Sequence, residues 1–562
     1  MNNDNKKDHH DSHNNSENNK PVGLFADKAY ERTPVTEKQE KQIPQSNQVI
    51  ATDDELLPNQ PALTKDAEPT PTATTLKKTI ASGEALKLAV VGHTNTGKTS
   101  ILRTLLRDVY FGEVKNEAAT TRHVEQAQLT DSQTGEVLVT LYDTPGLEDA
   151  SGLMDWLEDN TASRRDGIER LQQFLAADIA QGSDNVASKG YDLQDYDYSQ
   201  EAKVVRQLLA SDMAIYVVDA REPVLGKYKD ELAILSWAAI PVMPVFNFTD
   251  SQDANIDEWQ TMLARRNLHI STRFDSVAFE FDDEMRLWQN LATMLTHSER
   301  LEQLMARRTE NWAQLYDEAN IIIADFLLNV AAFVREIGDD DDPMPVLQQM
   351  QEAVRQSERT MQHNLLNLYK FYDNAVAATP LELQAYQQDP FDPELLKSYG
   401  IRTTSGAAAG ALLGLGIDAA ALGTTLGLGA AIGGIAGGLL SNTSSIADKI
   451  TGVKRLYIDP ATLTLLATRA IDLLTALRHR GHAATDATQL LYKGEKNSNN
   501  IDEENNIITL WPAHKLPSEL KKARGKPQWS SLSSGKSEQA QLLRADMAWS
   551  LSSKLQSHNL ER

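Results

Sequence analysis

The sequence contains no cysteine among its 562 residues. Disulfides, thiolate metal ligands and cysteine nucleophiles are therefore excluded, and a reducing compartment such as the cytoplasm is favoured. Positive charge is also scarce, because 55 Lys and Arg residues stand against 79 Asp and Glu residues and leave a net charge of −24. Since the phosphates of nucleic acid repel such a chain, we expect no nucleic-acid partner.

Large apolar residues are few in the N-terminal part, residues 1–84, which is rich in Asn, Asp, Glu, Lys, Gln, Thr and Pro. The first twenty residues lack the apolar segment of a secretory signal. A segment with so little apolar surface gains too little from burial to offset its chain entropy, so we predict a disordered tail. His9, His10 and His13 could bind a metal, but a polar tail is the simpler interpretation.

The sequence does have a phosphate-binding loop. Residues 92–99 match the pattern G-x-x-x-x-G-K-[S/T]. The apolar run Leu86–Val91 predicts a buried strand before the loop, and the apolar spacing from Ser100 to Arg107 predicts a helix after it. This order directs backbone N–H groups at one point, where they attract a polyphosphate. The predicted nucleotide-binding residues of the loop are Gly92, His93, Thr94, Asn95, Thr96, Gly97, Lys98, Thr99 and Ser100.

A second motif, Asp143-Thr144-Pro145-Gly146, follows the strand predicted at Val137–Tyr142 and lies 45 residues after Lys98. In such a pair of motifs the Lys reaches the β- and γ-phosphates, and the loop Thr, here Thr99, holds Mg²⁺. Asp143 is predicted to hold Mg²⁺ through water, and the Gly146 N–H to meet the γ-phosphate.

Further apolar runs predict the rest of a mostly parallel sheet. The clearest are Met213–Val218 and Pro241–Phe248, and Val277–Phe281 is the candidate for the last strand. The interval 150–210 is longer than a usual connection between strands and is predicted to be an insertion.

Four segments, taken in order, resemble the motifs of the translation-factor-like bacterial GTPases of the Era/TrmE group: 92–99, 120–123, 143–146 and 247–250. The resemblance covers about residues 85–295 and implies an α/β, three-layer P-loop GTPase domain that hydrolyses GTP to GDP and phosphate. By that group's pattern Thr121 closes on Mg²⁺, and Lys98, Thr121 and Gly146 form the catalytic set.

The family's guanine motif is N-K-x-D. Asn247 and Asp250 keep its two ends here, while Phe248 stands in place of the Lys. The resemblance implies that Asp250 accepts two hydrogen bonds from guanine, which adenine cannot supply. Phe248 could pack along the base as the Lys stem does, and ATP stays an alternative nucleotide. The fifth motif, S-A-K, has no clear match, and Ser276-Val277-Ala278 is a poor candidate.

Two residues bear on how hydrolysis is catalysed. Asn95 stands where potassium-dependent members of the group carry an Asn that coordinates K⁺. Leu147 stands where Ras-like enzymes use a Gln to orient water, which a Leu cannot do. By resemblance, the protein uses Mg²⁺ and depends for catalysis on K⁺, on a protein effector or on a second copy in a homodimer.

The sequence beyond the GTPase domain predicts an all-α domain at 296–480 and a linker and solvated tail at 481–562. Helical patterns cover Leu291–Ile337, Pro345–Ala378 and Leu456–Arg480. In layout the chain resembles bacterial GTPase proteins that carry a C-terminal domain of unknown function.

A stretch rich in Gly and Ala, residues 406–440, predicts a hydrophobic hairpin. Ala419–Leu440 is 22 residues without charge, and Asp418 could cap a turn between two helices. Glycines at four-residue spacing, Gly429, Gly433 and Gly437, let two helices approach closely. A membrane-inserting hairpin, a soluble helix pair and a single transmembrane helix all fit. We expect a cytoplasmic protein, peripheral to or inserted at the inner membrane. A membrane-associated structural protein that binds nucleotide with little turnover is the alternative.

Overall fold

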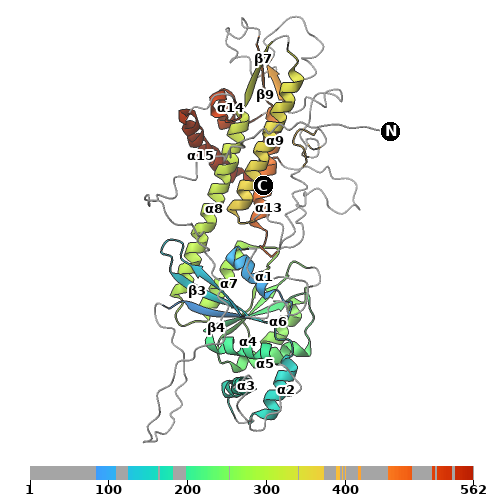
Figure 1. The fold of residues 1–562 in the computed structure, drawn as a ribbon, viewed down its shortest axis with the longest axis vertical. Helices are drawn as coiled ribbons and strands as arrows, with labels where there is room; N and C mark the ends of the chain where they lie inside the picture. Colours follow the sequence, from blue (N-terminus) through green and yellow to red (C-terminus); the bar gives the residue numbers. More distant parts are fainter. Residues whose placement is uncertain are drawn as a thin grey trace, which may run out of the picture. The chain divides into compact units, whose positions relative to one another are not determined.

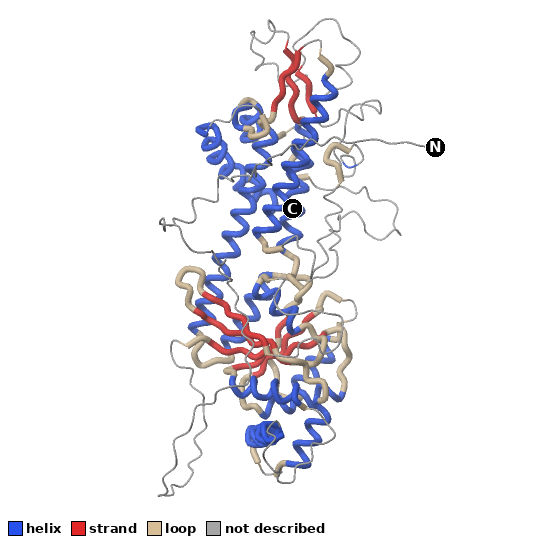
Figure 2. Tube along the Cα trace, in the orientation of Figure 1, coloured by secondary structure: helices blue, strands red, loops and turns tan. Residues whose placement is uncertain are grey.

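The computed structural model describes residues 84–108, 124–162, 165–181, 198–251, 254–338, 341–371, 388–392, 395, 399, 415–418, 453–483, 509–512, 515–533 and 538–560. These residues form an α/β domain followed by a mostly helical region (Figures 1 and 2). The predicted N-terminal tail up to residue 83, Thr121, and the stretch 406–440 except for 415–418 lie outside the described residues.

Six described strands form one sheet in the order β2-β3-β1-β4-β5-β6. The strands are β1 (Leu86–Val91), β2 (Glu125–Thr130), β3 (Val137–Asp143), β4 (Met213–Asp219), β5 (Val242–Asn247) and β6 (Thr272–Arg273). All neighbours pair in parallel except β2 and β3, which are the two arms of a hairpin. The apolar runs β4 and β5 are buried throughout, as expected of parallel strands with both faces covered.

Helices cover both faces of the sheet and so form the predicted three layers (Figure 1). Leu88 and Val90 of β1 face a core shared with α1 (Lys98–Leu106) and α7 (Phe281–Thr293). Ala89 and Val91 point to the other core. The helices of that second core are α2 (Ala150–Asn160), α3 (Gly167–Gln181), α4 (Ser199–Ala210), α5 (Gly226–Trp237) and α6 (Ile256–Ala264).

The last strand is not where the sequence predicted it. The pairing partner of β5 is the short β6, whereas the predicted strand Val277–Phe281 lies beyond it in a turn and at the start of α7. The Asp275 carboxylate ends β6, because its Oδ1 accepts the backbone N–H groups of Val277 at 2.9 Å and Ala278 at 3.1 Å. An apolar run was therefore mistaken for a strand.

The C-terminal region is built around α8 (Glu299–Ala331), a helix of 33 residues. Its apolar residues join a core that continues from the sheet into the other helices of the region. These helices are α9 (Pro343–Leu368), α13 (Pro460–Arg478), α14 (Ser518–Arg524) and α15 (Glu538–Leu560). Asp342 and Asp459 cap α9 and α13, each with a Pro at the first helical position, as the Asp-Pro pairs in the sequence indicate.

A small antiparallel sheet makes the C-terminal region less purely helical than predicted. Its strands β7 (Val334–Gly338), β9 (Val453–Ile458) and β8 (Leu415–Asp418) lie in that order. The predicted helices therefore end too late at Ile337 and begin too early at Leu456. Asp418 ends a strand and does not turn a helical hairpin, so the described part of 406–440 contradicts that prediction. The sequences of β7 and β9 adjoin long helical patterns, so the prediction included them in the neighbouring helices.

The prediction of a solvated C-terminal tail is wrong for its described part. Trp511 and Trp529 are only 4% and 6% exposed. Helix α15 packs along α8, where Arg544 donates to Asp325 at 2.7 Å. Burying two Trp side chains removes more apolar surface from water than a free tail would.

One described helix, α13, is long and apolar enough to cross a bilayer, with a mean hydropathy of 1.2 in its best window. Inside the fold, 72% of that window is buried, which is typical of a helix that packs in a hydrophobic core.

Candidate nucleotide-binding site

The loop after β1 has the backbone that phosphate binding requires. Gly92, Asn95 and Gly97 have positive φ angles of 144°, 64° and 87°, and α1 begins directly after Gly97. A Cβ on Gly97 would overlap the Asn247 amide and come within 3.0 Å of the Phe248 ring. Gly97 is therefore required both for its conformation and for the close approach of the guanine-motif side chains.

Lys98 lies buried at the centre of this loop. Its ammonium donates to the carbonyl oxygens of His93 at 2.8 Å and Gly92 at 3.2 Å. Burial lowers the pKa of Lys98, while the nearby carboxylates of Asp143 and Glu231 oppose that shift. The loop thus holds one cation where the phosphates of a nucleotide would lie.

Two of the predicted magnesium ligands, Thr99 and Asp143, lie in contact with each other. The Thr99 hydroxyl donates to Oδ2 of Asp143. Burial raises the pKa of Asp143 to about 6, against the lowering effects of the Thr99 hydroxyl and of Lys98. The other carboxylate oxygen, Oδ1, is buried without a hydrogen-bond partner.

This donor set fits Mg²⁺, because Mg²⁺ prefers oxygen ligands and a buried, unpartnered oxygen is available to one of its waters. In the described ranges, no group of three or more His, Cys, Asp or Glu side chains could hold a metal. Thr99 and Asp143 would therefore hold Mg²⁺ together with the phosphates of a nucleotide. The third predicted ligand, Thr121, lies outside the described residues.

The turn after β3 packs directly on the phosphate loop. The Thr144 hydroxyl donates to the Val90 carbonyl at 2.8 Å. A Cβ on Gly146 would lie 2.7 Å from the Thr94 nitrogen, so only a glycine allows this contact. Leu147 is fully buried, so its side chain has no access to an attacking water.

A partly buried polar network around His93 was not predicted from the sequence. His93 Nδ1 lies 2.8 Å from Oε1 of Glu231, and Nε2 lies 2.8 Å from Lys227 Nζ. A carboxylate only accepts and an ammonium only donates, so Nδ1 carries the proton. Tyr216 donates to the second oxygen of Glu231 at 2.8 Å. The one sequence signal was Glu231 itself, a charge on the buried side of a helix.

Asn247 joins three loops next to the phosphate loop's Thr96: the phosphate loop itself, the loop 247–250 and the turn 275–278. Its amide nitrogen donates to the Thr96 carbonyl at 3.1 Å, and its oxygen accepts the N–H groups of Phe248 and Ser276, each at 3.0 Å. The Asp250 carboxylate is exposed, and its backbone N–H donates to Asp275 at 3.3 Å. The turn at 275–278, which contains the poor candidate Ser276-Val277-Ala278 for the fifth motif, thus contacts both Asn247 and Asp250.

Phe248 fills the position of the missing Lys. Its backbone is left-handed, with φ of 56°, and its ring lies next to Gly97. The Arg221 guanidinium stacks 4.0 Å from the ring centroid and is itself held by both oxygens of Asp219, at 2.9 and 2.7 Å. An aromatic ring capped by a cation therefore lies beside the phosphate loop.

Comparison with known proteins accounts for both parts of the chain. Residues 87–248 match the family described as 50S ribosome-binding GTPase (MMR_HSR1). Residues 260–549, just over half of the chain, match the family described as Domain of unknown function (DUF3482). The chain belongs to the DUF3482 family. The predicted resemblance to P-loop GTPases with a C-terminal domain of unknown function is confirmed for this DUF3482 protein.

Several solved structures are similar to part of the DUF3482 protein. Era from Aquifex aeolicus, bound to GDP and aluminium fluoride, has 16% identity and a TM-score of 0.26 over 38% of this chain and 57% of Era. The G domain of the FeoB iron transporter from T. maritima has 18% identity and a TM-score of 0.21 over 39% of this chain and 99% of its own. No curated protein matches the sequence.

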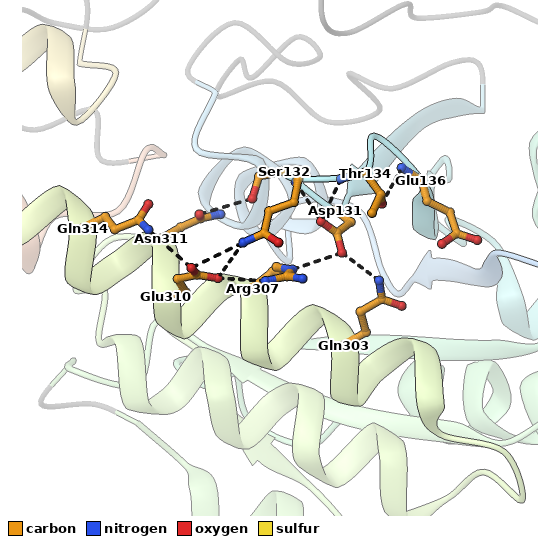
Figure 3. Close-up of polar contacts among 10 residues, drawn as sticks. Asp131, Ser132, Thr134, Glu136, Gln303, Arg307, Glu310, Asn311 and Gln314 are labelled. Atoms are coloured by element: carbon orange, nitrogen blue, oxygen red, sulfur yellow. Dashed lines mark hydrogen bonds and ion pairs between the residues drawn. The ribbon is translucent and has the colours of Figure 1, made fainter. Parts of the chain in front are cut away.

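The DUF3482 region, residues 260–549, also forms hydrogen bonds with the β2–β3 hairpin of the GTPase domain (Figure 3). Asp131, in the hairpin turn, accepts from Gln303 at 2.7 Å and Arg307 at 3.1 Å, both on α8. Asp131 also accepts the backbone N–H of Gln133 at 2.8 Å. The Gln133 bond makes the largest contribution, and together with the bonds from Gln303 and Arg307 it holds the pKa of Asp131 well below its usual range. The hairpin that ends in Asp143 is therefore anchored to α8.

Proposed function

We propose that this protein binds GTP and hydrolyses it to GDP and phosphate, and that the change in nucleotide acts as a conformational switch. The observation that carries the proposal is the cluster of Lys98, Thr99 and Asp143 under the strained phosphate loop, with one buried carboxylate oxygen left without a partner. The match of residues 87–248 to the family described as 50S ribosome-binding GTPase supports GTP as the nucleotide.

Each residue has a defined role in this proposal. Lys98 places a positive charge at the β- and γ-phosphates, and Thr99 and Asp143 hold Mg²⁺, which when bound neutralises charge on the same phosphates. We propose that the Gly146 N–H meets the γ-phosphate, and the close packing of Gly146 on Thr94 of the loop supports this role. Loss of that phosphate would release the turn that begins at Asp143, and this release is the proposed switch.

Guanine specificity should depend on Asp250. In the variant Asp250→Asn, an amide donor would face the guanine donors, so affinity for GTP should fall about 5- to 150-fold, equivalent to about 1–3 kcal/mol, with ATP affinity unchanged. The measurement is competition of GTP and ATP against a fluorescent guanine nucleotide. Asp257→Asn, an exposed carboxylate in the first turn of α6, is the matched control. If ATP competes as well as GTP in the parent protein, the guanine assignment is wrong.

We also propose that K⁺ assists hydrolysis, because Leu147 is buried and Asn95 is exposed at the rim of the loop. Turnover should be faster in KCl than in NaCl, and Asn95→Ala should remove the difference. Asn95 has φ of 64°, so Asn95→Gly is the cleaner test: it removes the amide without adding backbone strain. Equal turnover of the parent protein in both salts would reject the cation mechanism and favour a group supplied by an effector or a second copy.

We also propose that the protein contacts the inner membrane through residues 406–440. It rests on the 22 uncharged residues Ala419–Leu440. Flotation of the full chain with lipid vesicles, in GDP and in a GTP analogue, tests it. Absence of the protein from the vesicle fraction in both states would remove the membrane contact and leave the GTPase proposal intact.

A further inference from the structure

The segment after α13 forms a small antiparallel bridge with the base-side turn of the nucleotide site. Phe279 N–H donates to the His479 carbonyl at 3.1 Å, and Gly481 N–H donates to the Val277 carbonyl at 2.8 Å. Ala278 and Arg480 form the pair between these two bonds. Residues distant in the sequence thus share backbone hydrogen bonds directly behind the site.

Gly481 is required at this bridge because there is no room for a side chain. A Cβ at this position would overlap the carbonyl oxygen of Ser276 and lie 3.0 Å from the Val277 nitrogen. Both atoms belong to the backbone, so they cannot move aside as a flexible side chain would. Any residue larger than glycine must therefore displace the turn or separate the two segments.

The same turn is tied on its other side to the phosphate loop. Ser276 N–H donates to the Asn247 side chain at 3.0 Å, and the Asn247 amide donates to the Thr96 carbonyl at 3.1 Å. The Ser276 carbonyl accepts the Thr104 hydroxyl at 3.0 Å. Ser276, Asn247 and Thr104 are fully buried, so water cannot replace a bond that is lost.

We infer that the DUF3482 region completes the nucleotide site and sets its affinity through Gly481, a positioning residue for the turn 275–278. The match to the GTPase family ends at residue 248, whereas both segments of the bridge lie within 260–549. The turn 275–278, which holds Asn247 and Asp250, therefore belongs to the DUF3482 region, whereas Asn247 and Asp250 themselves precede it. This inference rests on the proposed function and adds a structural element that controls it.

The test compares Gly481→Ala with Gly525→Ala in the full chain. A Cβ on Gly525 would meet only one backbone oxygen, at 3.6 Å, so this variant is the matched control. Dissociation of a fluorescent GDP analogue should be roughly 5- to 150-fold faster in Gly481→Ala than in the parent, with the control unchanged. Affinity for inorganic pyrophosphate should stay at the parental value, because pyrophosphate uses the phosphate loop and not the base-side turn.

A second variant keeps the inference testable if Gly481→Ala does not fold. Thr104→Val removes the hydroxyl that holds the Ser276 carbonyl and keeps the side-chain volume, so it should also speed GDP release. The inference is overturned if both variants fold and release GDP like the parent, or if GDP and pyrophosphate weaken together. If the parent protein binds no guanine nucleotide, it is the proposed function that fails.

Discussion

Replacing Lys98 with Ala should abolish nucleotide binding, with the dissociation constant for GTP rising by about 100-fold or more. The ammonium is the single Lys or Arg charge in the loop 92–99, and each charge-assisted hydrogen bond to a phosphate contributes about 1.5–3 kcal/mol. The variant also leaves the carbonyls of Gly92 and His93 without the donor that they share in the structure. Isothermal titration with GTP and Mg²⁺ measures the loss.

Lys87→Ala is the matched control for this prediction. Lys87 lies in β1 with an exposed side chain, and its printed bonds to Asp212 are made by its backbone N–H and carbonyl groups. The control should bind GTP like the parent, and both variants should keep the parental far-UV spectrum. GTP binding by Lys98→Ala at parental strength would refute the assignment of the site.

Replacing Arg469 with Met should lower the free energy of unfolding by about 3–5 kcal/mol at pH 8, because it leaves a buried carboxylate uncompensated. Arg469 and Glu358 are 1% and 4% exposed, and they connect α13 to α9. Their Nε and Oε1 atoms are 3.1 Å apart, a distance that makes an ion pair, although the two groups are not oriented as a hydrogen bond.

The size of this loss should depend on pH. Burial raises the pKa of Glu358 to about 7, and the charge of Arg469 opposes that rise. A carboxyl with a raised pKa in the folded state is more stable protonated, so its contribution to stability falls as pH rises through the folded pKa. Without Arg469 the pKa should rise further, and the deficit of the variant should be smaller at pH 5.5 than at pH 8.

Urea unfolding of the parent and the variant at the two pH values tests both statements. Arg359→Met is the control, since this neighbouring side chain is 63% exposed and should change stability by less than about 0.5 kcal/mol. A deficit of Arg469→Met that stays constant with pH would mean that Glu358 is not the group left uncompensated.

The sequence predicted the parts of the site that lie close together along the chain. The phosphate loop, its strand and its helix are contiguous, and the turn at Asp143 has a fixed chemistry, so local patterns were sufficient. Glu231 and Tyr216 reach the loop from α5 and β4, and only the folded sheet brings them to His93. No local pattern contains that information.

Other misses have a different physical cause. Strand β6 is only two residues long and is defined by its pairing with β5, so it has no periodicity to detect. Strands β7 and β9 adjoin long helices and were absorbed into their patterns. The C-terminal tail was predicted to be solvated because its apolar residues are sparse. In the structure, however, Trp511 and Trp529 are buried within the core around α8.

The length and stiffness of α8 give its anchor on the hairpin a geometrical consequence. At 1.5 Å per residue its 33 residues extend about 50 Å, and the helix contains neither Gly nor Pro that would bend it. Asp131 holds its N-terminal half, while Asp325, near its other end, is paired with Arg544. Asp325 lies 18 residues beyond Arg307, or about 27 Å along the helix axis, so a tilt of about 5° at the hairpin would move it by about 2.4 Å. Movement too small to break a hydrogen bond at the hairpin turn would thus become a displacement of nearly half a helical turn where α8 contacts α15.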